Sequence, residues 1–430
     1  MTYTLKDVLL PNDSKVNIVI DGELIAAIGQ ESSGEVIDCN GLRVMPGFVD
    51  LHTHLREPGK EDSETVLTGS RAAVLGGFTA VSAMANTFPV ADTAGVVEQV
   101  FRLGKEAGLC DVYPVGAVTQ GLQGERLAEL GAMADSAAQV RIFSDDGKCV
   151  SDSLVMRRAL EYVKIFGGVV AQHAQDPKLT VDAQMNEGEY SGKLGLAGWP
   201  AVAEESIIAR DILLADHVKS RLHICHLTTK GGVELVRWAK SQGIDVTAEV
   251  TPHHLLLTDE LANSYDAAYK VNPPLRTNED VQALREGVAD GTIDIIATDH
   301  APHPVEDKEC EWSAAAFGML GLESALGVVV SALIEPGHIT WERLADVMSI
   351  TPAKIGGYAR HIDGIKVGAP ANLALINTSK SLVIDREKQA SKSKNTPFHG
   401  MTFPVAVEHT IFNGVLVVKN GVLTGETYAA

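Results

Sequence analysis

Two histidines and one arginine alternate in the short stretch DLHTHLREPG, residues 50–59, at the end of an apolar run. Side chains in a strand repeat with a period of two, so His52, His54 and Arg56 are expected to point the same way. Three such groups are unfavourable in a hydrophobic core, because each needs a polar or charged partner. They suit a site in which imidazoles bind a metal ion and the guanidinium faces an anion.

Other residues with metal-ligand chemistry also follow apolar runs. They are Asp145 and Asp146 in FSDDG, His173 in AQHAQD, His226 in HICHLTT, and Asp299, His300 and His303 in ATDHAPH. Imidazole and carboxylate groups are ligands of Zn²⁺ and related ions. Four histidines and two aspartates exceed one tetrahedral site and suit a pair of metals that share a bridging carboxylate. Which of the two neighbouring aspartates is the ligand stays open here, because the other could cap a helix or support its neighbour.

Several other histidines are expected to be structural rather than metal ligands. A single histidine near the end of a strand is more often a buried, hydrogen-bonded side chain than a ligand. For His173 and His226 the two interpretations are evenly balanced when each is taken singly, and their coincidence with successive strand ends favours metal binding. The structural interpretation is kept for His217, His223, His253, His254 and His300.

Eight short apolar runs, most of them followed by a helix-like segment, could bring these residues together. The runs are residues 44–52, 78–84, 111–118, 139–144, 168–173, 221–226, 245–250 and 293–298. Eight strand–helix units in series predict an α/β fold of the (β/α)₈ (TIM) barrel type, whose functional residues collect at the carboxyl ends of the strands. The alternative is a doubly wound open sheet. That fold usually carries a glycine-rich turn after its first strand, where this chain has HTHLR.

The two ends of the chain are predicted to form one small β-sandwich domain. Asp21-Gly22 separates two apolar-rich runs near the start, and Asn413-Gly414 and Asn420-Gly421 separate three such runs near the end. These dipeptides are hairpin signals. Neither end has enough strands for a stable sheet alone. We therefore expect residues 1–45 and 362–430 to form this domain and residues 46–361 to form the barrel.

Composition limits the partners and the compartment. Acidic residues outnumber basic ones 56 to 36, and the formal charge of −20 argues against nucleic acid or an anionic membrane as partner. A metal and one arginine can still reverse the potential locally for a small anionic substrate. The five cysteines are scattered and form no CxxC pair. No apolar run is long enough to span a membrane, so a cytoplasmic location is expected.

Taken together, these motifs resemble the dihydroorotase family of the amidohydrolase superfamily. The resemblance rests on DLHTHLREPG, MANT, FSDDG, the histidines after the fifth and sixth strands, NPPLR and ATDHAPHPVEDK. It implies reversible hydrolysis of (S)-dihydroorotate to N-carbamoyl-L-aspartate in pyrimidine biosynthesis by a metal-activated hydroxide. The relevant relatives would be of the bacterial type I branch, because many others bridge their metals with a strand-4 lysine, where this chain has FSDD.

The resemblance also implies a role for each residue. His52, His54 and Asp146 would bind the first metal, His173 and His226 the second, and Asp146 would bridge them. Asp299 would touch the first metal and act as general base and acid. The substrate would be held by Arg56, Asn86, Asn272 and His303. One or two zinc ions per chain are expected.

Three functions remain to be compared. The first is the dihydroorotase reaction. The second is a hydantoinase-like or allantoinase-like cyclic amide hydrolase, which would share the HxH motif. The third is a non-catalytic partner of aspartate transcarbamoylase, although every expected ligand position is filled here. We expect a homodimer or higher oligomer, and association with aspartate transcarbamoylase is a further candidate interaction.

Overall fold

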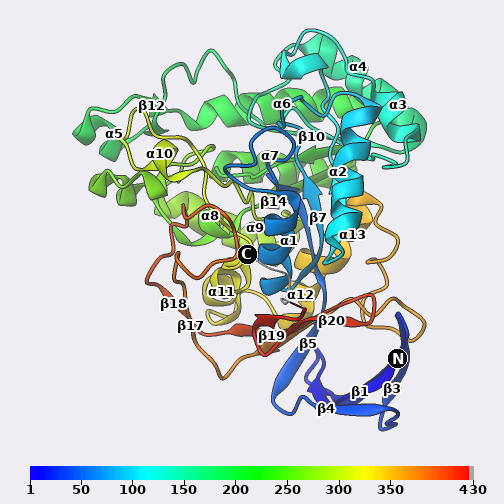
Figure 1. Ribbon diagram of the computed structural model, residues 1–430. Helices are drawn as coiled ribbons and strands as arrows, with labels where there is room; N and C mark the ends of the chain where they lie inside the picture. The colour runs from blue at the N-terminus through cyan, green and yellow to red at the C-terminus, as the bar shows by residue number, and fades with distance from the viewer. Residues whose placement is uncertain (426–430) are drawn as a thin grey trace.

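Parallel strands covered by helices form the larger part of the computed structural model, which describes residues 1–425 (Figure 1). One parallel sheet contains β6 (Phe48–Thr53), β7 (Phe78–Ala83) and β8 (Asp111–Pro114). A second contains β9 (Ile142–Phe143), β10 (Val169–Gln172), β13 (Leu222–Ile224), β14 (Val246–Val250) and β15 (Ile295–Ile296). Each strand lies within one of the predicted apolar runs or overlaps it, so the prediction of a parallel α/β fold is confirmed.

The two parallel sheets are linked at both of their edges. An isolated parallel bridge joins Gly116, just after β8, to Phe143 in β9. Another joins Thr53 in β6 to His300, shortly after β15. Within both sheets the strands also follow one another in chain order. A doubly wound sheet reverses its strand order at one point, so this alternative is wrong.

Helices follow most of these strands and pack on their outer side (Figure 1). Threonine caps start several of them; Thr65 accepts a hydrogen bond from the backbone of Thr68, and Thr277 from that of Asp280. The longer helices are α1 (Val66–Leu75), α2 (Ala94–Ala107), α4 (Ser153–Val163), α6 (Ala201–Val218), α7 (Lys230–Ser241) and α9 (Asn278–Asp290). The shorter ones are α3 (Leu130–Asp135), α11 (Ala325–Val329), α12 (Trp341–Ala345) and α13 (Thr351–Gly356), with π-helical turns η5 (Val330–Ile334) and η6 (Asp346–Ile350) after α11 and α12.

Several short elements lie in the connections and were not predicted. They are β11 (Met185–Asn186), α5 (Glu189–Leu194), β12 (Gly198–Trp199), α8 (Pro252–Leu256), α10 (Val305–Lys308) and the 3₁₀ turns η1 (Gln120–Leu122), η2 (Lys164–Phe166), η3 (Asp259–Ser264) and η4 (Ala267–Tyr269). Among residues 1–425, no helix has both the length and the hydrophobicity that a membrane span requires.

Strands from both ends of the chain share one nine-stranded sheet. It contains β1 (Thr2–Leu9), β2 (Lys15–Asp21), β3 (Leu24–Gly29), β4 (Glu35–Asp38), β5 (Leu42–Pro46), β16 (Leu373–Asn377), β19 (Ala406–Phe412), β20 (Val415–Lys419) and β21 (Val422–Leu423). The amino-terminal half joins the carboxyl-terminal half where β5 pairs antiparallel with β16. Asn413 and Gly414 both have positive φ, as the tight turn between β19 and β20 requires. The hairpin β17 (Leu382–Val383) and β18 (Thr402–Phe403) lies outside this sheet.

Two groups of buried apolar residues surround the parallel strands. Val49, Ile142 and Ile295 pack together with Tyr358, just after α13, in one cluster. The other, larger cluster fills the space between strands and helices. The strands are thus held from both sides, and polar side chains at their carboxyl ends are left to form a site.

Candidate metal centre

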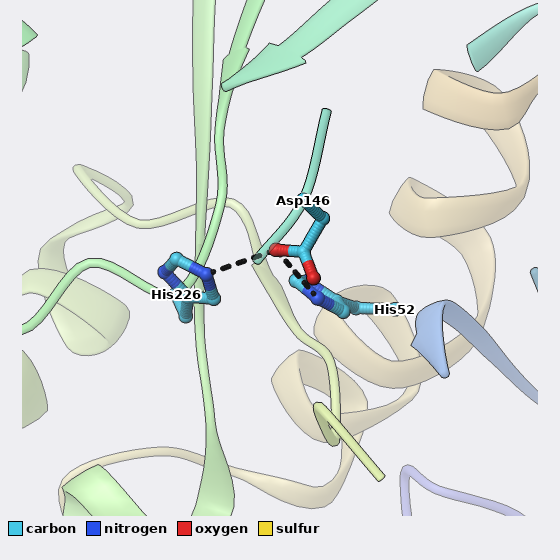
Figure 2. Close-up of side chains that lie close together, drawn as sticks. All are labelled: His52, Asp146 and His226. Carbon is cyan, nitrogen blue, oxygen red and sulfur yellow. Dashed lines mark hydrogen bonds and ion pairs between the residues drawn. The ribbon is translucent and has the colours of Figure 1, made fainter. Parts of the chain in front are cut away.

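The six predicted ligands meet beyond the carboxyl ends of five parallel strands, and all are buried. Figure 2 shows the carboxylate of Asp146 between the rings of His52 and His226. The contributing segments are His52 and His54 from β6 and the residue after it, Asp146 after β9, His173 after β10, His226 after β13 and Asp299 after β15. Residues that are up to 247 positions apart in the sequence, His52 and Asp299, are therefore neighbours in space.

The first set of ligand atoms has the spacing of a coordination shell. Nε2 of His52 lies 3.2 Å from Oδ1 of Asp146 and 3.5 Å from Oδ1 of Asp299. Nε2 of His54 lies 3.1 Å from Oδ1 of Asp299 and 3.3 Å from Oδ2 of Asp146. Ligands bound tetrahedrally to zinc at about 2.0–2.1 Å are about 3.3 Å from one another. These four residues could therefore hold one ion at the centre of their ligand atoms.

A second set shares the carboxylate of Asp146. Its Oδ1 lies 3.2 Å from Nδ1 of His173 and 3.3 Å from Nε2 of His226. The same two ring nitrogens are 2.8 Å apart. Asp146 thus contacts all four histidines, as a carboxylate between two neighbouring ions would.

The polar partners of His52 indicate that a cation fits here. Its Nδ1 lies 2.5 Å from Oε1 of Glu249, whereas its buried Nε2 makes no hydrogen bond within residues 1–425. A carboxylate that holds the far nitrogen of a ligating histidine fixes the ring and leaves the other nitrogen free for a metal. The donor set of imidazoles and carboxylates also matches zinc chemistry.

Electrostatics support the same conclusion. Burial lowers the pKa of His52, but Asp146, Glu249 and Asp299 together raise it well above its ordinary value. Burial raises the pKa of Asp146, but His52 and the other histidines hold it well below its ordinary range. The buried carboxylates thus require positive charge close by. A metal ion supplies that charge while the imidazoles stay neutral, as ligands must be.

The neighbouring carboxylates of Asp145 and Asp146 have different partners. Oδ1 of Asp145 accepts hydrogen bonds from the backbone N–H groups of Val118 and Thr119, at 2.8 and 2.9 Å, and Thr119 Oγ1 donates to its other oxygen. Its carboxylate therefore organises the loop after β8. Asp146 faces the histidines instead.

Most of the histidines predicted to be structural have structural partners. His223 lies 3.1 Å from Glu249, His254 lies 2.7 Å from Thr251 Oγ1, and His300 Nε2 lies 3.3 Å from Glu64. His217 is exposed on α6. His253 differs, because its side chain is buried and its Nε2 has no hydrogen-bond partner among the described residues.

A cavity of about 290 Å³ opens onto the ligand cluster. It is lined by His54, Arg56, Asn86, Asp146, Gly147, His173, Asn272, Asp299, Ala301, His303, Phe317 and Gly318. All four residues predicted to bind substrate are thus in its wall. The volume suits a small ring compound.

Arg56 and His303 are neighbours in the lining of the cavity. Nε of Arg56 donates to the carbonyl of Pro302 at 3.0 Å, and its Nη2 lies 3.3 Å from His303 Nε2. Burial lowers the pKa of Arg56 to about 10, although Asp299 opposes this, so the guanidinium stays charged at neutral pH. Burial and the adjacent Arg56 lower the pKa of His303 to about 2, which keeps its ring neutral. This corner of the cavity is therefore cationic.

Asn86 and Asn272 present amide groups to the cavity. Oδ1 of Asn86 lies 2.9 Å from His54 Nδ1, so this asparagine also orients a predicted ligand. Nδ2 of Asn272 donates to Gln175 Oε1 at 3.3 Å, whereas its own buried Oδ1 has no hydrogen-bond partner in the part of the chain that the structure describes. An acceptor left without a partner at a cavity wall is expected to bind a donor on a ligand.

Backbone strain is concentrated at this site. Arg56, His226 and Asp299 all have left-handed backbone conformations, with φ of 62°, 31° and 47°. Such conformations cost about 1–3 kcal/mol each in residues other than glycine and cluster at functional sites.

Two supporting residues were missed by the sequence analysis. Glu249 in β14 holds His52 and also accepts a hydrogen bond from the backbone N–H of His226 at 3.2 Å. Its signal was a glutamate inside the apolar run DVTAEV. Oε1 of Gln175 lies 2.8 Å from Nε2 of His173. Its signal was the two-residue spacing from His173, which places both side chains on one side of an extended chain.

Over most of its length the chain is similar to dihydroorotases. It is 64% identical to the dihydroorotase of Streptomyces coelicolor over 411 residues, which cover 95% of this chain and 96% of that relative. The chain belongs to the dihydroorotase family. It is also 62% identical to the dihydroorotase of Leifsonia xyli, with 98% and 97% of the two chains covered, and 51% identical to that of Mycobacterium tuberculosis, with 95% and 96% covered. A family model described as dihydro-orotase-like matches residues 41–232.

Solved structures of cyclic amide hydrolases share the fold of this dihydroorotase family member. The L-hydantoinase (dihydropyrimidinase) from Arthrobacter aurescens has a TM-score of 0.87 and 27% identity, with 98% of this chain and 96% of that chain covered. The dihydropyrimidinase from Brevibacillus agri has a TM-score of 0.84 and 22% identity, with 99% and 96% covered. The second likeness shows the fold alone.

Proposed function

We propose that the protein catalyses the reversible hydrolysis of (S)-dihydroorotate to N-carbamoyl-L-aspartate, a reaction of pyrimidine biosynthesis. The observation that carries this proposal is one cavity lined both by a buried arginine and by histidines and aspartates of the cluster. The substrate has a carboxylate for the arginine and a ring amide for the cluster. The identity of the chain to named dihydroorotases supports the same reaction.

We propose that the cluster binds zinc, as one ion or two. The first ion would be held by His52, His54 and Asp299. The second would be held by His173 and His226, and Asp146 would be a ligand of both. Support comes from the donor types and from the distances of 3.1–3.5 Å between neighbouring donors of the first set. When bound, such an ion acts as a Lewis acid, which makes water a better nucleophile and a carbonyl a better electrophile near pH 7.

The chain itself would supply the proton transfer and the orientation. Asp299 lines the cavity, so its carboxylate could take a proton from the attacking water and deliver it to the ring nitrogen that leaves. In that step the amide C–N bond breaks and a new C–O bond forms, while the proton moves from oxygen to nitrogen.

Three other side chains would bind the substrate carboxylate, and one its ring. Arg56 offers a planar fork of N–H donors, and Asn86 and His303 lie on the same cavity wall. Asn272 would accept a hydrogen bond from a ring N–H, because its buried Oδ1 has no partner among the described residues. Fixing the carboxylate turns the reacting carbonyl toward the cluster, which supplies part of the rate enhancement.

Replacing Arg56 is expected to act mainly on substrate binding. Arg56→Gln removes the charge and should raise KM for dihydroorotate by roughly 10- to 100-fold, since a hydrogen bond to a charged group is worth about 1.5–3 kcal/mol. Arg56→Lys keeps the charge but lacks the two parallel N–H donors, so its KM should lie between those of the wild type and Arg56→Gln. Steady-state kinetics would measure this, with the exposed Arg360→Gln as control. An unchanged KM in Arg56→Gln would remove Arg56 from the carboxylate site.

We further propose that the eight parallel strands close into one (β/α)₈ barrel over residues 46–361. The two bridges between the parallel sheets and the likeness to the hydantoinase support closure. Residues 1–45 and 362–430 would form the small β-sandwich domain, a division supported by the nine-stranded sheet that both ends of the chain share; residues 426–430 of this prediction lie outside the described residues. The homodimer or higher oligomer, the complex with aspartate transcarbamoylase and the cytoplasmic location stay predictions.

A side-by-side substrate assay tests the proposed reaction. Hydantoin hydrolysis is the second candidate, because a hydantoinase shares the fold at 27% identity. We expect the zinc-loaded protein to turn over dihydroorotate at least 100 times faster, in kcat/KM, than hydantoin or allantoin. The reason is that neither alternative carries a carboxylate for Arg56. Faster cleavage of hydantoin would reverse the assignment.

A further inference from the structure

Residues 389–396, named here the crossing segment, carry polar side chains into the interior although they form no helix or strand. Ser391, Ser393, Asn395 and Thr396 are all buried. Buried polar groups in a loop need partners, since each unpaired group is costly. The partners of this segment lie beside the cavity rather than in the terminal sheet.

The side chain of Asn395 binds the backbone of two loops that line the cavity. Its Nδ2 donates to the carbonyls of Ala301 at 2.9 Å and Gly318 at 3.2 Å. Its Oδ1 accepts from the backbone N–H of His303 at 3.2 Å. One planar amide thus fixes the distance between the loop after β15 and residue 318. Asn395 itself does not line the cavity.

The loop that Asn395 binds is also hydrogen-bonded to Arg56. Pro302 lies between the two residues of its loop that Asn395 binds, and its carbonyl accepts the hydrogen bond from Arg56 Nε at 3.0 Å. The space around this loop is tight, because a Cβ on Gly318 would lie 2.7 Å from His303 Nε2 and 2.9 Å from Ala301 Cβ. A small movement of the loop would therefore move both the arginine and the histidine.

One buried and one half-buried carboxylate, from Glu64 and Glu323, anchor the start of the crossing segment. Oε1 of Glu64 accepts from the backbone N–H of Lys392 at 3.0 Å, and its Oε2 accepts from Ser391 Oγ. Oε1 of Glu323 accepts from the backbone N–H of Ala390 at 2.9 Å. These hydrogen bonds hold residues 390–392 in place, three to five positions before Asn395.

We infer that Asn395 is a positioning residue that sets the geometry of the carboxylate-binding corner formed by Arg56 and His303. This inference rests on the proposed function, in which that corner binds the substrate carboxylate. Asn395 is hydrogen-bonded to none of the predicted metal ligands, and it contacts the cavity wall only from behind, through the backbone of Ala301, His303 and Gly318. Its loss should therefore weaken substrate binding and leave the metal cluster intact.

Asn395→Ala tests the inference in the full-length, zinc-loaded protein. We expect KM for dihydroorotate to rise at least tenfold, kcat to change less than threefold and zinc content to stay unchanged. Equilibrium binding of orotate, which carries the same carboxylate, should weaken in parallel. The control is Asn372→Ala, because Asn372 is also buried and binds backbone, accepting from Asn413 N–H at 2.8 Å, but lies at the terminal sheet. It should lower the melting temperature without raising KM.

The outcomes separate the inference from the proposed function. If the wild type turns over dihydroorotate and Asn395→Ala leaves KM and orotate affinity unchanged, the inference is overturned and the function stands. A matched rise of KM in Asn372→Ala would also overturn it, because general loosening would then explain the effect. If the wild type neither turns over dihydroorotate nor binds orotate, the proposed function and the inference are both overturned. Should Asn395→Ala fail to fold, Asn395→Ser carries the same test, because the shorter serine side chain cannot make all three hydrogen bonds of the amide.

Discussion

Replacing Asp299 by asparagine is expected to lower kcat for dihydroorotate by roughly 10²–10⁴-fold, the range that a positioned general acid–base contributes. An amide has nearly the shape of the carboxylate but cannot accept the proton. Asparagine also tolerates the left-handed backbone of this position, where φ is 47°, better than alanine does. The substitution thus separates proton transfer from backbone strain. Steady-state rates and zinc content should be measured on the same sample.

Zinc should remain bound to a large extent in Asp299→Asn, because His52, His54 and Asp146 still surround the first position. KM should change little, since Arg56 and Asn272 are untouched. Asp290→Asn, which alters an exposed aspartate paired with Arg237, serves as control and should keep full activity. Retention of more than a tenth of the wild-type kcat with zinc bound would exclude Asp299 as the general base. Loss of all zinc from Asp299→Asn would show that Asp299 is needed chiefly to bind the metal.

The parallel strands and their helices could be predicted because their signals are local. Apolar runs such as residues 168–173 are short and end in a polar residue, and the helices between them carry threonine caps. The pairing of the two chain ends was also predictable, because neither end offers enough strands for a sheet. The short elements between β10 and α6 were not predicted. Two-residue strands such as β11 have no period to detect, and only tertiary contacts define them.

The candidate site could be predicted to the level of its ligands and no further. The spacing of His52 and His54 alone predicts metal ligands. Single histidines become candidate ligands because they lie at the ends of successive strands. Residues that act through another residue give no such signal. In the sequence, Glu249 cannot be told from any other glutamate in a strand. Only the structure shows that its carboxylate contacts His52 Nδ1. Asn395 lies 96 positions after Asp299 in a loop, and only the folded chain brings it to His303.

Removing the metal is expected to abolish turnover and to lower the melting temperature together. Dialysis against a chelator leaves the buried Asp146 and Asp299 without the cation that their surroundings require, so both function and stability should suffer. A ligand present at 100 times its Kd stabilises the folded state by about 2.7 kcal/mol, which corresponds to a shift of several degrees. Activity and melting temperature should both return when Zn²⁺ is added.

Asp146→Asn gives the matched variant for this experiment, because Asp146 contacts all four histidines. We expect this variant to bind less zinc than the wild type at every concentration and to gain little stability when zinc is added. Zinc per chain, measured by elemental analysis during the titration, distinguishes one ion from two by the point at which activity saturates. Full turnover in rigorously metal-free protein would contradict a metal-dependent hydrolase. The four histidines around Asp146 would then need another explanation, such as a proton-sharing cluster that holds the strand ends together.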